Sequence, residues 1–423
     1  MTELRTVGIL STGSEILEGL YADRNASWLA ERLTRAGLDV KLMIAAPDDR
    51  PMLKAALEQF ASTVDVIVST GGLGPTEDDV CRWVMADVFG WTLISHEVSI
   101  QRMEERFRRN ARQMPENNKV QALLPHQAHV LPNDWGTAPG FFMDAASEPK
   151  SPALIALPGP PKEMQPMWEK YAEPLLLARS GGEGNLCRTR TLHTFGKPES
   201  EVNQRVAAHF QCDAGRRMTI LAKTYGIDLR YSVRGNQEAD VETELASWES
   251  IIRGSLDPDD IYGVDDDSLA TVCAGILTER KISLSVAESL TGGLLAKTLT
   301  DPPGSGEFFL GGFLTYAIEE KNKLLGVRQD TLDNYGAVSA ECAREMAEQC
   351  RIKTGADLAV STTGNAGPDA AEGKPVGLIY VALADGKKSE VRELHLGADR
   401  EQNRLTTVQN ALDLLRRYLI ANK

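Results

Sequence analysis

The feature that most constrains the fold is an apolar strand-like run that ends in a polar turn and leads directly into a helix. Residues 282–286 alternate as a strand does, and residues 294–299 have a helical pattern. The turn between them contains Ser289, Thr291, Gly292 and Gly293. Such a turn is typical of α/β domains, where it holds a nucleophile at a bend close to the N–H groups of a helix start.

A lysine follows this serine in the same part of the chain. Lys321 comes 32 residues after Ser289, beyond a second strand-like run at 308–314. A neutral lysine can activate a serine hydroxyl for amide hydrolysis. Taken alone, a serine before a helix is more often a cap, and a lysine is more often a solvated ammonium. The pair therefore indicates a Ser–Lys hydrolase site, with a capping serine and a surface lysine as the alternative.

The first part of the chain alternates strand and helix patterns. Three strands with two helices between them are indicated at 6–10, 25–36, 40–44, 53–60 and 64–68. Asn25 or Ser27 is the expected N-cap of the first helix. The third strand is an unbroken apolar run, which is typical of a buried parallel sheet. This order predicts a doubly wound α/β domain.

A glycine-rich loop follows the third of these strands. It contains Gly71, Gly72 and Gly74, and Asp78 and Asp79 come shortly after it. Ligands of open α/β sheets bind at the carboxyl ends of strands, where glycines let backbone N–H groups approach a phosphate. The two aspartates have two interpretations. They complement the dipole of the next helix, or they bind a divalent ion that bridges phosphates.

Composition excludes several classes of protein. The 423 residues carry 60 acidic and 46 basic side chains, a net charge of −14, which argues against a nucleic-acid or anionic membrane partner. No run approaches the roughly 20 apolar residues of a membrane span, and the N-terminus is unlike a secretory signal. Six scattered cysteines suit a reducing cytoplasm. His126 and His129 are weak candidates for a metal pair, because further ligands in register are missing.

A small α+β module is expected between two α/β domains. We place the domains at 1–173, 174–260 and 261–423, with the middle one as a spacer or dimerisation element. The acidic runs at 257–260 and 265–267 suit a solvated linker and a helix cap better than a calcium loop, which requires ordered ligand spacing.

The motifs around the serine and the lysine resemble the C-terminal domain of CinA proteins. They lie at 287–293, 301–305, 311–312, 316–321, 336–339, 363–368 and 374–377. The resemblance implies a serine–lysine amidohydrolase that deamidates nicotinamide mononucleotide without a cofactor. It implies Ser289 as the nucleophile, Lys321 as the base and Tyr316 as a residue that orients the lysine. Backbone amides near Thr291 and Gly292 are the implied oxyanion donors. The implied phosphate or ribose pocket contains Gly292, Gly293, Thr363, Gly364 and Gly367.

The first α/β domain resembles the N-terminal domain of the same family. The motifs lie at 71–79, 114–122, 136–140 and 157–164. That domain shares its fold with molybdopterin-binding proteins, and the resemblance implies metal-dependent hydrolysis of ADP-ribose to AMP and ribose 5-phosphate. The implied ion is Mg, Mn or Co, and its implied ligands are Asp78, Asp79 and Glu15. The implied nucleotide-binding residues are Gly71, Gly72, Gly74, Thr76 and Asn25.

The chain departs from the family pattern at a few positions. Ala317 and Ile318 stand where many relatives carry serine and asparagine, and the loop at 369–373 lacks the usual glycine-rich segment. Asn365 and Cys81 stand where an apolar residue and a threonine are usual. The alternative function is therefore a non-catalytic nucleotide- or pterin-binding, competence-associated protein. A homodimer is expected from the resemblance alone.

Overall fold

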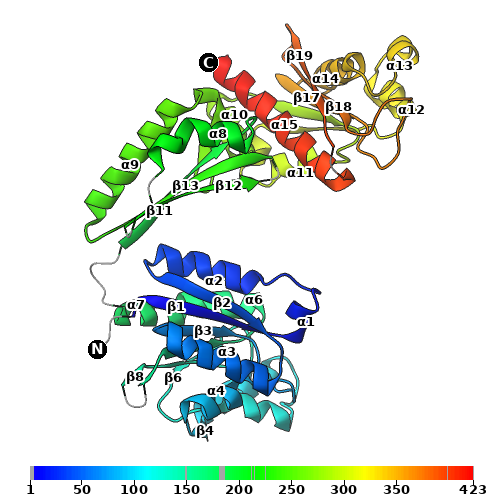
Figure 1. Ribbon diagram of the computed structural model, residues 1–423. Helices are drawn as coiled ribbons and strands as arrows, with labels where there is room; N and C mark the ends of the chain where they lie inside the picture. Colours follow the sequence, from blue (N-terminus) through cyan, green and yellow to red (C-terminus); the bar gives the residue numbers. More distant parts are fainter. Residues whose placement is uncertain are drawn as a thin grey trace. The chain divides into compact units, whose positions relative to one another are not determined.

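The computed structural model describes residues 4–147, 150–180, 186–210, 212–213, 215–223, 225–397 and 399–422. Its internal contacts divide the chain into two compact units (Figure 1). The first unit contains Met1–Thr189 and Ser232–Leu245, and the second contains Arg190–Tyr231 and Ala246–Lys423. This division does not coincide with the expected boundaries after residues 173 and 260, which stay predictions.

The first unit contains a six-stranded sheet in the order β2-β1-β3-β10-β7-β6. Strands β1, β2, β3 and β10 run parallel, whereas β7 and β6 are added antiparallel at one edge. The strands are β1 (Thr6–Thr12), β2 (Asp39–Ala46), β3 (Val66–Thr70), β6 (His129–Leu131), β7 (Gly140–Met143) and β10 (Ala153–Leu157). The parallel core confirms the doubly wound α/β prediction.

Helices cover both faces of this sheet, as Figure 1 shows for α2 and α3. One core joins Val7 and Ile9 of β1 to Leu29 of α2, and the other joins Leu10 of β1 to Leu57 of α3. The remaining elements are α1 (Ser14–Leu17), α2 (Arg24–Arg35), α3 (Arg50–Thr63), α4 (Cys81–Phe89), β4 (Leu93–Ser95), α5 (Glu97–Arg109), η1 (Glu116–Ala122), β5 (Leu123–Pro125), β8 (Ala146–Ser147), β9 (Lys150–Ser151), α6 (Pro161–Met167), η2 (Trp168–Ala172) and α7 (Glu173–Arg179). Because successive strand residues face opposite sides, an all-apolar strand serves both cores.

The prediction of Asn25 or Ser27 as the first N-cap is wrong. Helix α2 begins at Arg24, and Asp23 is its cap, with the side chain accepting from Ala26 N–H at 2.9 Å. Asn25 instead donates from Nδ2 to the Gly159 carbonyl at 2.6 Å, which ties α2 to the loop after β10.

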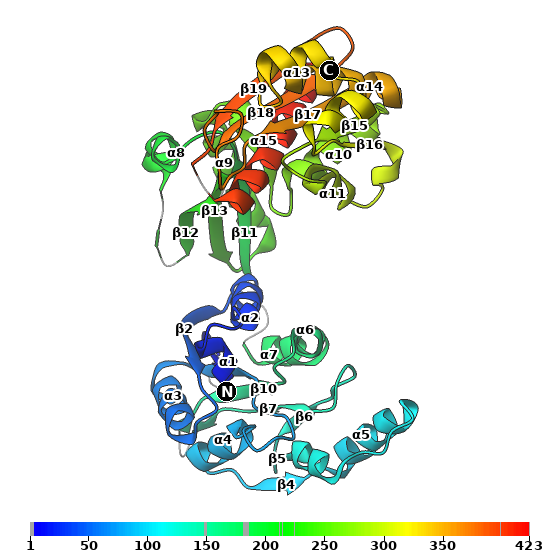
Figure 2. The same ribbon diagram turned by 90° about the vertical axis from the view of Figure 1, so that its right-hand side faces the viewer.

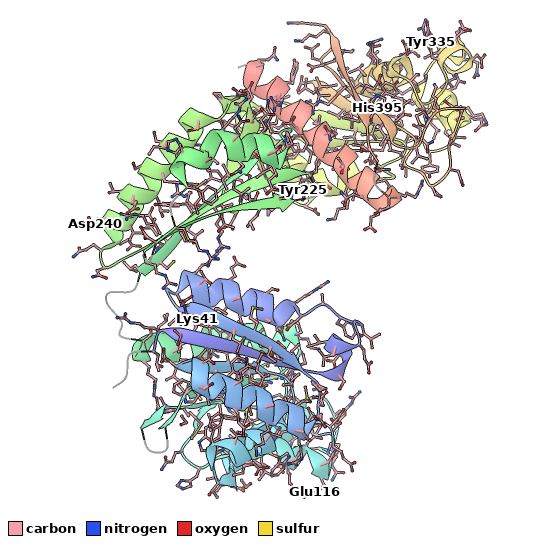
Figure 3. All side chains as sticks on the ribbon, in the orientation of Figure 1. Lys41, Glu116, Tyr225, Asp240, Tyr335 and His395 are labelled. Atoms are coloured by element: carbon pink, nitrogen blue, oxygen red, sulfur yellow. The ribbon has the colours of Figure 1, made fainter. Side chains whose placement is uncertain are left out.

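The middle of the chain forms a four-stranded sheet in the order β12-β13-β11-β14, which confirms the expected α+β pattern. Glu249 of α9 accepts from Arg190 of β11, and Trp248 stacks on Tyr231 of β13. The elements are β11 (Leu186–Thr194), α8 (Glu199–Val206), η3 (Ala207–His209), β12 (Arg216–Lys223), β13 (Gly226–Gly235), α9 (Glu238–Ser255), η4 (Pro258–Asp260) and β14 (Ile261–Val264). Figure 3 labels Tyr225, which immediately precedes β13, and Asp240, in the first turn of α9.

The last part of the chain is a five-stranded sheet in the order β16-β15-β17-β18-β19, with β16, β15 and β17 parallel. Helices α10, α11 and α15 pack on one core, and α13 and α14 pack on the other (Figure 2). The elements are α10 (Leu269–Arg280), β15 (Leu284–Glu288), α11 (Leu294–Thr300), η5 (Ser305–Glu307), β16 (Phe309–Leu314), α12 (Ile318–Glu320), η6 (Lys321–Leu325), α13 (Gln329–Tyr335), α14 (Ala340–Thr354), β17 (Leu358–Gly364), β18 (Leu378–Ala384), β19 (Ser389–His395) and α15 (Arg400–Ala421). No helix in the described ranges is long and apolar enough to cross a membrane.

Candidate functional site

The serine and the lysine meet at the carboxyl end of β15. Ser289 is the first residue after this strand, and its N–H donates to the Thr362 carbonyl of β17 at 3.0 Å. Lys321 Nζ lies 2.9 Å from Ser289 Oγ. The two side chains belong to residues that are only 8% and 1% exposed. The arrangement is that of a nucleophile and a base in direct contact, largely shielded from water.

A neighbouring strand holds the lysine. Lys321 Nζ donates to the Thr315 carbonyl at 2.7 Å, and Thr315 N–H donates to the Glu288 carbonyl at 2.9 Å. Ser289 directly follows β15, and the carbonyl that holds Lys321 directly follows β16, so the pair lies where these two paired parallel strands end. Burial lowers the pKa of Lys321 below its ordinary value, against a smaller opposing effect of Cys342 and Glu372. A lowered pKa favours the neutral amine that a general base requires.

The start of α11 is already occupied by a carboxylate. Glu288, 2% exposed, accepts from the N–H groups of Gly293 and Leu295 at 3.0 Å and of Ala296 at 2.8 Å. The N–H of Gly292 donates to the Ser289 carbonyl at 3.1 Å. The expectation that Gly292 supplies an oxyanion donor is therefore not matched, since its N–H is used within the turn.

Two other N–H groups of the turn are available. Those of Leu290 and Thr291 donate to no acceptor within the part of the chain that the structure describes. Arg404 of α15 donates to the Leu290 carbonyl at 3.1 Å and to the Thr291 carbonyl at 2.7 Å. Because C=O and N–H point in opposite directions across a trans peptide, the Thr291 N–H points away from Arg404. Leu290 and Thr291 therefore carry backbone N–H groups, next to Ser289, that have no acceptor in the described residues.

Other predicted residues of this domain have structural partners. The Thr291 hydroxyl is paired with that of Thr362 at 2.7 Å, and Thr363 donates to the Ala337 carbonyl at 2.7 Å. Tyr316 is 59% exposed, and its hydroxyl accepts from Arg400 at 2.6 Å. The residue that holds Lys321 is therefore Thr315, through its carbonyl, and not Tyr316 as the sequence predicted.

The glycines at the end of β17 are required by close packing. A Cβ on Gly364 would lie 2.6 Å from Ile379 Cα, and one on Gly367 would lie 2.8 Å from Val376 Cγ1. Asn365, where an apolar residue is usual, accepts from Gly367 N–H at 3.1 Å and donates to the Lys374 carbonyl at 3.3 Å. This substitution therefore stabilises the loop itself.

In the first unit, the ends of the parallel strands surround a cavity of about 400 Å³. Its lining includes Glu15 after β1, Asp48 after β2, the loop after β3 and Glu163 after β10, as the rule for open sheets predicts. Of the predicted residues, the lining contains Gly71, Gly72, Gly74, Asp78, Asp79 and Glu15. Thr76 and Asn25 are outside it: Thr76 donates to Asp79, and Asn25 to Gly159.

Carboxylates dominate the charge of this cavity. Burial raises the pKa of Asp48, and the nearby charges of Glu15 and Asp78 raise it further. Helix α4 begins at Cys81, so Asp78 and Asp79 lie before its first turn. The helix-dipole interpretation expects acidic side chains within that first turn. Oxygen donors of this kind suit Mg²⁺ or a similar hard cation. As the side chains stand, no group of three or more His, Cys, Asp or Glu in the described ranges is arranged to hold a metal.

The structure adds residues that sequence reasoning missed. Glu288 carried a readable signal, because a carboxylate beside a helix start is favoured there. Asp48 and Arg404 carried none, because each reaches its site only through the fold. Of the weak candidate histidine pair, His129 contacts Asp144 at 3.1 Å and Arg179 at 3.0 Å.

Comparison with known proteins matches three segments of the chain to three domain families. Residues 266–419 match the model of the "CinA C-terminal domain", residues 8–178 that of a "probable molybdopterin binding domain", and residues 189–263 that of the "damage-inducible protein CinA KH domain". A "CinA-like protein" of Dictyoglomus thermophilum is 38% identical over 413 residues, 97% of this chain and 98% of its own length.

A second curated relative gives the same assignment, and solved structures also match part of the chain. A "CinA-like protein" of Syntrophomonas wolfei is 38% identical over 418 residues, 98% of this chain and 99% of its own. The crystal structure of a competence/damage inducible protein from Agrobacterium tumefaciens is 37% identical; the match covers 36% of this chain and 93% of that one, with a TM-score of 0.35.

Proposed function

The chain belongs to the CinA family, and from that premise we propose that it deamidates nicotinamide mononucleotide through Ser289 and Lys321. The observation that carries the proposal is the 2.9 Å contact between Lys321 Nζ and Ser289 Oγ in a buried site. The alternative of a capping serine and a solvated lysine requires an exposed amine, and Lys321 is 1% exposed.

The chemistry follows from the contacts. Ser289 Oγ attacks the carboxamide carbon while Lys321 Nζ takes the hydroxyl proton, and the oxyanion forms opposite the N–H groups of Leu290 and Thr291. Lys321 returns the proton to the nitrogen, and ammonia leaves an ester on Ser289. A water, deprotonated by Lys321 in turn, hydrolyses the ester to nicotinate mononucleotide and free Ser289.

The test is product analysis with the full chain and nicotinamide mononucleotide. We expect nicotinate mononucleotide and ammonia in equal amounts, with free nicotinamide as the control substrate. A non-catalytic binding protein would be stabilised by the mononucleotide in a thermal shift assay and would release no ammonia. That outcome, with a folded chain, would reject the amidase proposal.

A second candidate function belongs to the first unit, and the cavity at the strand ends favours it. We propose that it hydrolyses ADP-ribose to AMP and ribose 5-phosphate with a divalent metal. Glu15, Asp48 and Asp78 line the cavity and are proposed to turn toward the metal when it binds, and the bound ion would polarise the pyrophosphate. The loop at 71–74 would hold a phosphate, and Asp79 keeps the following turn closed through Thr76.

This second function is tested by following AMP release from ADP-ribose in Mg²⁺, in Mn²⁺ and after EDTA treatment. We expect release that stops in EDTA, returns with added metal and falls in Asp48→Asn and Asp78→Asn. Hydrolysis that continues unchanged in EDTA would reject the metal, and absence of AMP under all conditions would reject the activity.

A further inference from the structure

A buried arginine lies under the glycine-rich loop of the first unit. Arg82 of α4 is 2% exposed, and all of its hydrogen-bond acceptors are carbonyls. It donates to Val120 at 2.6 Å, to Gly74 at 3.3 Å and to Leu73. Within the described ranges it forms no ion pair, and its Nε has no partner. Arg82 is therefore a buried cation without a carboxylate in contact.

Such a charge is costly to bury unless a compensating anion is close. Burial lowers the pKa of Arg82 to about 10, and the charge of Asp79 opposes this decrease. The guanidinium is thus still charged at neutral pH. Arg82 is absent from the lining of the cavity, whereas Leu73 and Gly74 belong to it. The positive charge therefore lies behind the loop, on the side away from the cavity.

The same contacts set the direction of the loop amides. The Leu73 carbonyl is turned toward Arg82, so the Gly74 N–H of that trans peptide points the opposite way. The N–H groups of Gly72, Leu73 and Gly74 donate to no acceptor in the described residues. Gly71 and Gly72 have φ of 96° and 63°, a conformation that side chains rarely adopt. Successive free N–H groups in such a loop form an anion-binding concavity.

We infer that Arg82 is the positioning residue of a pyrophosphate-binding loop: it turns the Gly74 N–H toward the cavity and supplies the positive charge that a bound phosphoryl oxygen compensates. The inference rests on the second proposed function, since it concerns the phosphate part of that site. The free loop N–H groups indicate an anionic ligand, and the second proposed function specifies that anion as a pyrophosphate. It also explains why α4 carries an arginine at a position that faces only backbone carbonyls.

The binding test uses inorganic pyrophosphate as the probe, with the full chain and calorimetry in the presence of Mg²⁺. We expect Arg82→Gln to weaken binding about tenfold or more, the loss typical of a charged hydrogen-bond donor. Arg82→Lys restores the charge without the forked donors and should recover part of the affinity. Arg108→Gln, at an exposed position of α5, is the matched control and should bind like wild type.

A folded Arg82→Gln variant that binds pyrophosphate as wild type does would overturn the inference. A wild type that binds no pyrophosphate would instead reject the second proposed function.

A second measurement does not depend on the Arg82 variants folding. Labelling with [1-¹³C]leucine and [¹⁵N]glycine selects the four Leu–Gly peptides, at 73–74, 310–311, 325–326 and 396–397. Leu73→Met removes one signal and so assigns Gly74. We expect pyrophosphate to shift the Gly74 amide and leave the other three in place. Binding without a shift at Gly74 would show that its N–H does not face the phosphate, which contradicts the inference.

Discussion

Lys321 is the proposed base, and it lies in a buried site that disfavours its charged form. Its amine contacts Ser289 Oγ and the Thr315 carbonyl, and burial lowers its pKa. The base form is the neutral one, so activity rises with pH until the amine is deprotonated. The pH at which this happens lies below the ordinary lysine value of 10.5.

We predict that kcat/KM for ammonia release rises with pH through an apparent pKa below 10.5 in wild type. Lys321→Met should lose about 10²–10⁴-fold in rate, the usual contribution of a general base. Lys321→Arg should be equally inactive, because a guanidinium stays protonated. Rates measured from pH 6 to 10 decide this, and a methionine variant with the wild-type profile would remove the lysine from the mechanism.

His193 in the middle sheet is a second buried titratable residue. Its Nδ1 lies 2.7 Å from Asp228 Oδ1, and its Nε2 lies 2.7 Å from the Asp265 carbonyl. Both partners are acceptors, so both ring nitrogens act as donors and the ring is an imidazolium. The hydrogen bond to Asp228 raises the pKa of His193, although burial lowers it.

Because the pKa of His193 is higher in the folded state, its charged hydrogen bond to Asp228 stabilises the fold fully below pH 6.5, the unfolded-state pKa. The stabilisation is lost as the pH rises through the folded-state pKa. We predict that His193→Gln lowers the urea midpoint more at pH 5.5 than at pH 9. The loss of unfolding free energy should be larger at pH 5.5 by about 1.5–3 kcal/mol, the usual contribution of a hydrogen bond to a charged group. His126→Gln, at an exposed position, is the control. A loss that is equal at both pH values would contradict the charged state of the ring.

At the scale of elements, Glu288 joins β15 to α11. Its carboxylate accepts three N–H groups of the helix start, which would otherwise have no partner. The same contacts fix the turn that carries Ser289. The helix dipole makes a negative charge favourable at this end.

We predict that Glu288→Gln destabilises the chain by about 1–2 kcal/mol, as the loss of a helix cap does, and also lowers the amidase rate. Glu390→Gln, at an exposed position of β19, should change neither. Thermal unfolding and ammonia release measure the two effects. A fully stable Glu288→Gln variant with wild-type rates would contradict the role of this cap.

Local apolar patterns were sufficient to predict most elements of the fold. The strands indicated at 6–10, 40–44 and 64–68 became β1, β2 and β3, because their periodicity is a property of neighbouring residues. The cap of α2 was mispredicted because the Asn25 side chain donates to the carbonyl of Gly159, which is far away in sequence. Helix α4 begins only at Cys81, because the backbone N–H of Thr76 first closes a turn onto the Asp79 side chain.

The site was only partly predictable for the same reason. Ser289 was visible from its turn, and Lys321 from its spacing and the family resemblance. Asp48 and Arg404 approach their sites through tertiary contacts, which no local pattern records. Tyr316 was assigned to the lysine although it contacts Arg400, because sequence proximity does not fix the direction of a side chain.

On the scale of the whole molecule, the two proposed sites lie in separate compact units. Ser289 and Lys321 belong to the second unit, and Asp48 and Asp78 belong to the first. Each unit has hydrophobic cores of its own. The homodimer and the cytoplasmic location stay predictions.

We predict that the two activities are independent. Ser289→Ala should leave AMP release from ADP-ribose unchanged, and Asp78→Asn should leave ammonia release unchanged, because mutations at sites that share no partners act additively. Parallel assays of both variants with both substrates measure this. Loss of both activities in either variant, with folding intact, would show that one unit depends on the other.

The most direct test of the central claim compares ammonia release from nicotinamide mononucleotide by wild type and by Ser289→Ala, with enzyme in excess over substrate. The account predicts one ammonia for each substrate molecule in wild type and no measurable release in the variant. Equal rates in the two proteins would contradict it, because the bond would then be cleaved without the Ser289 hydroxyl.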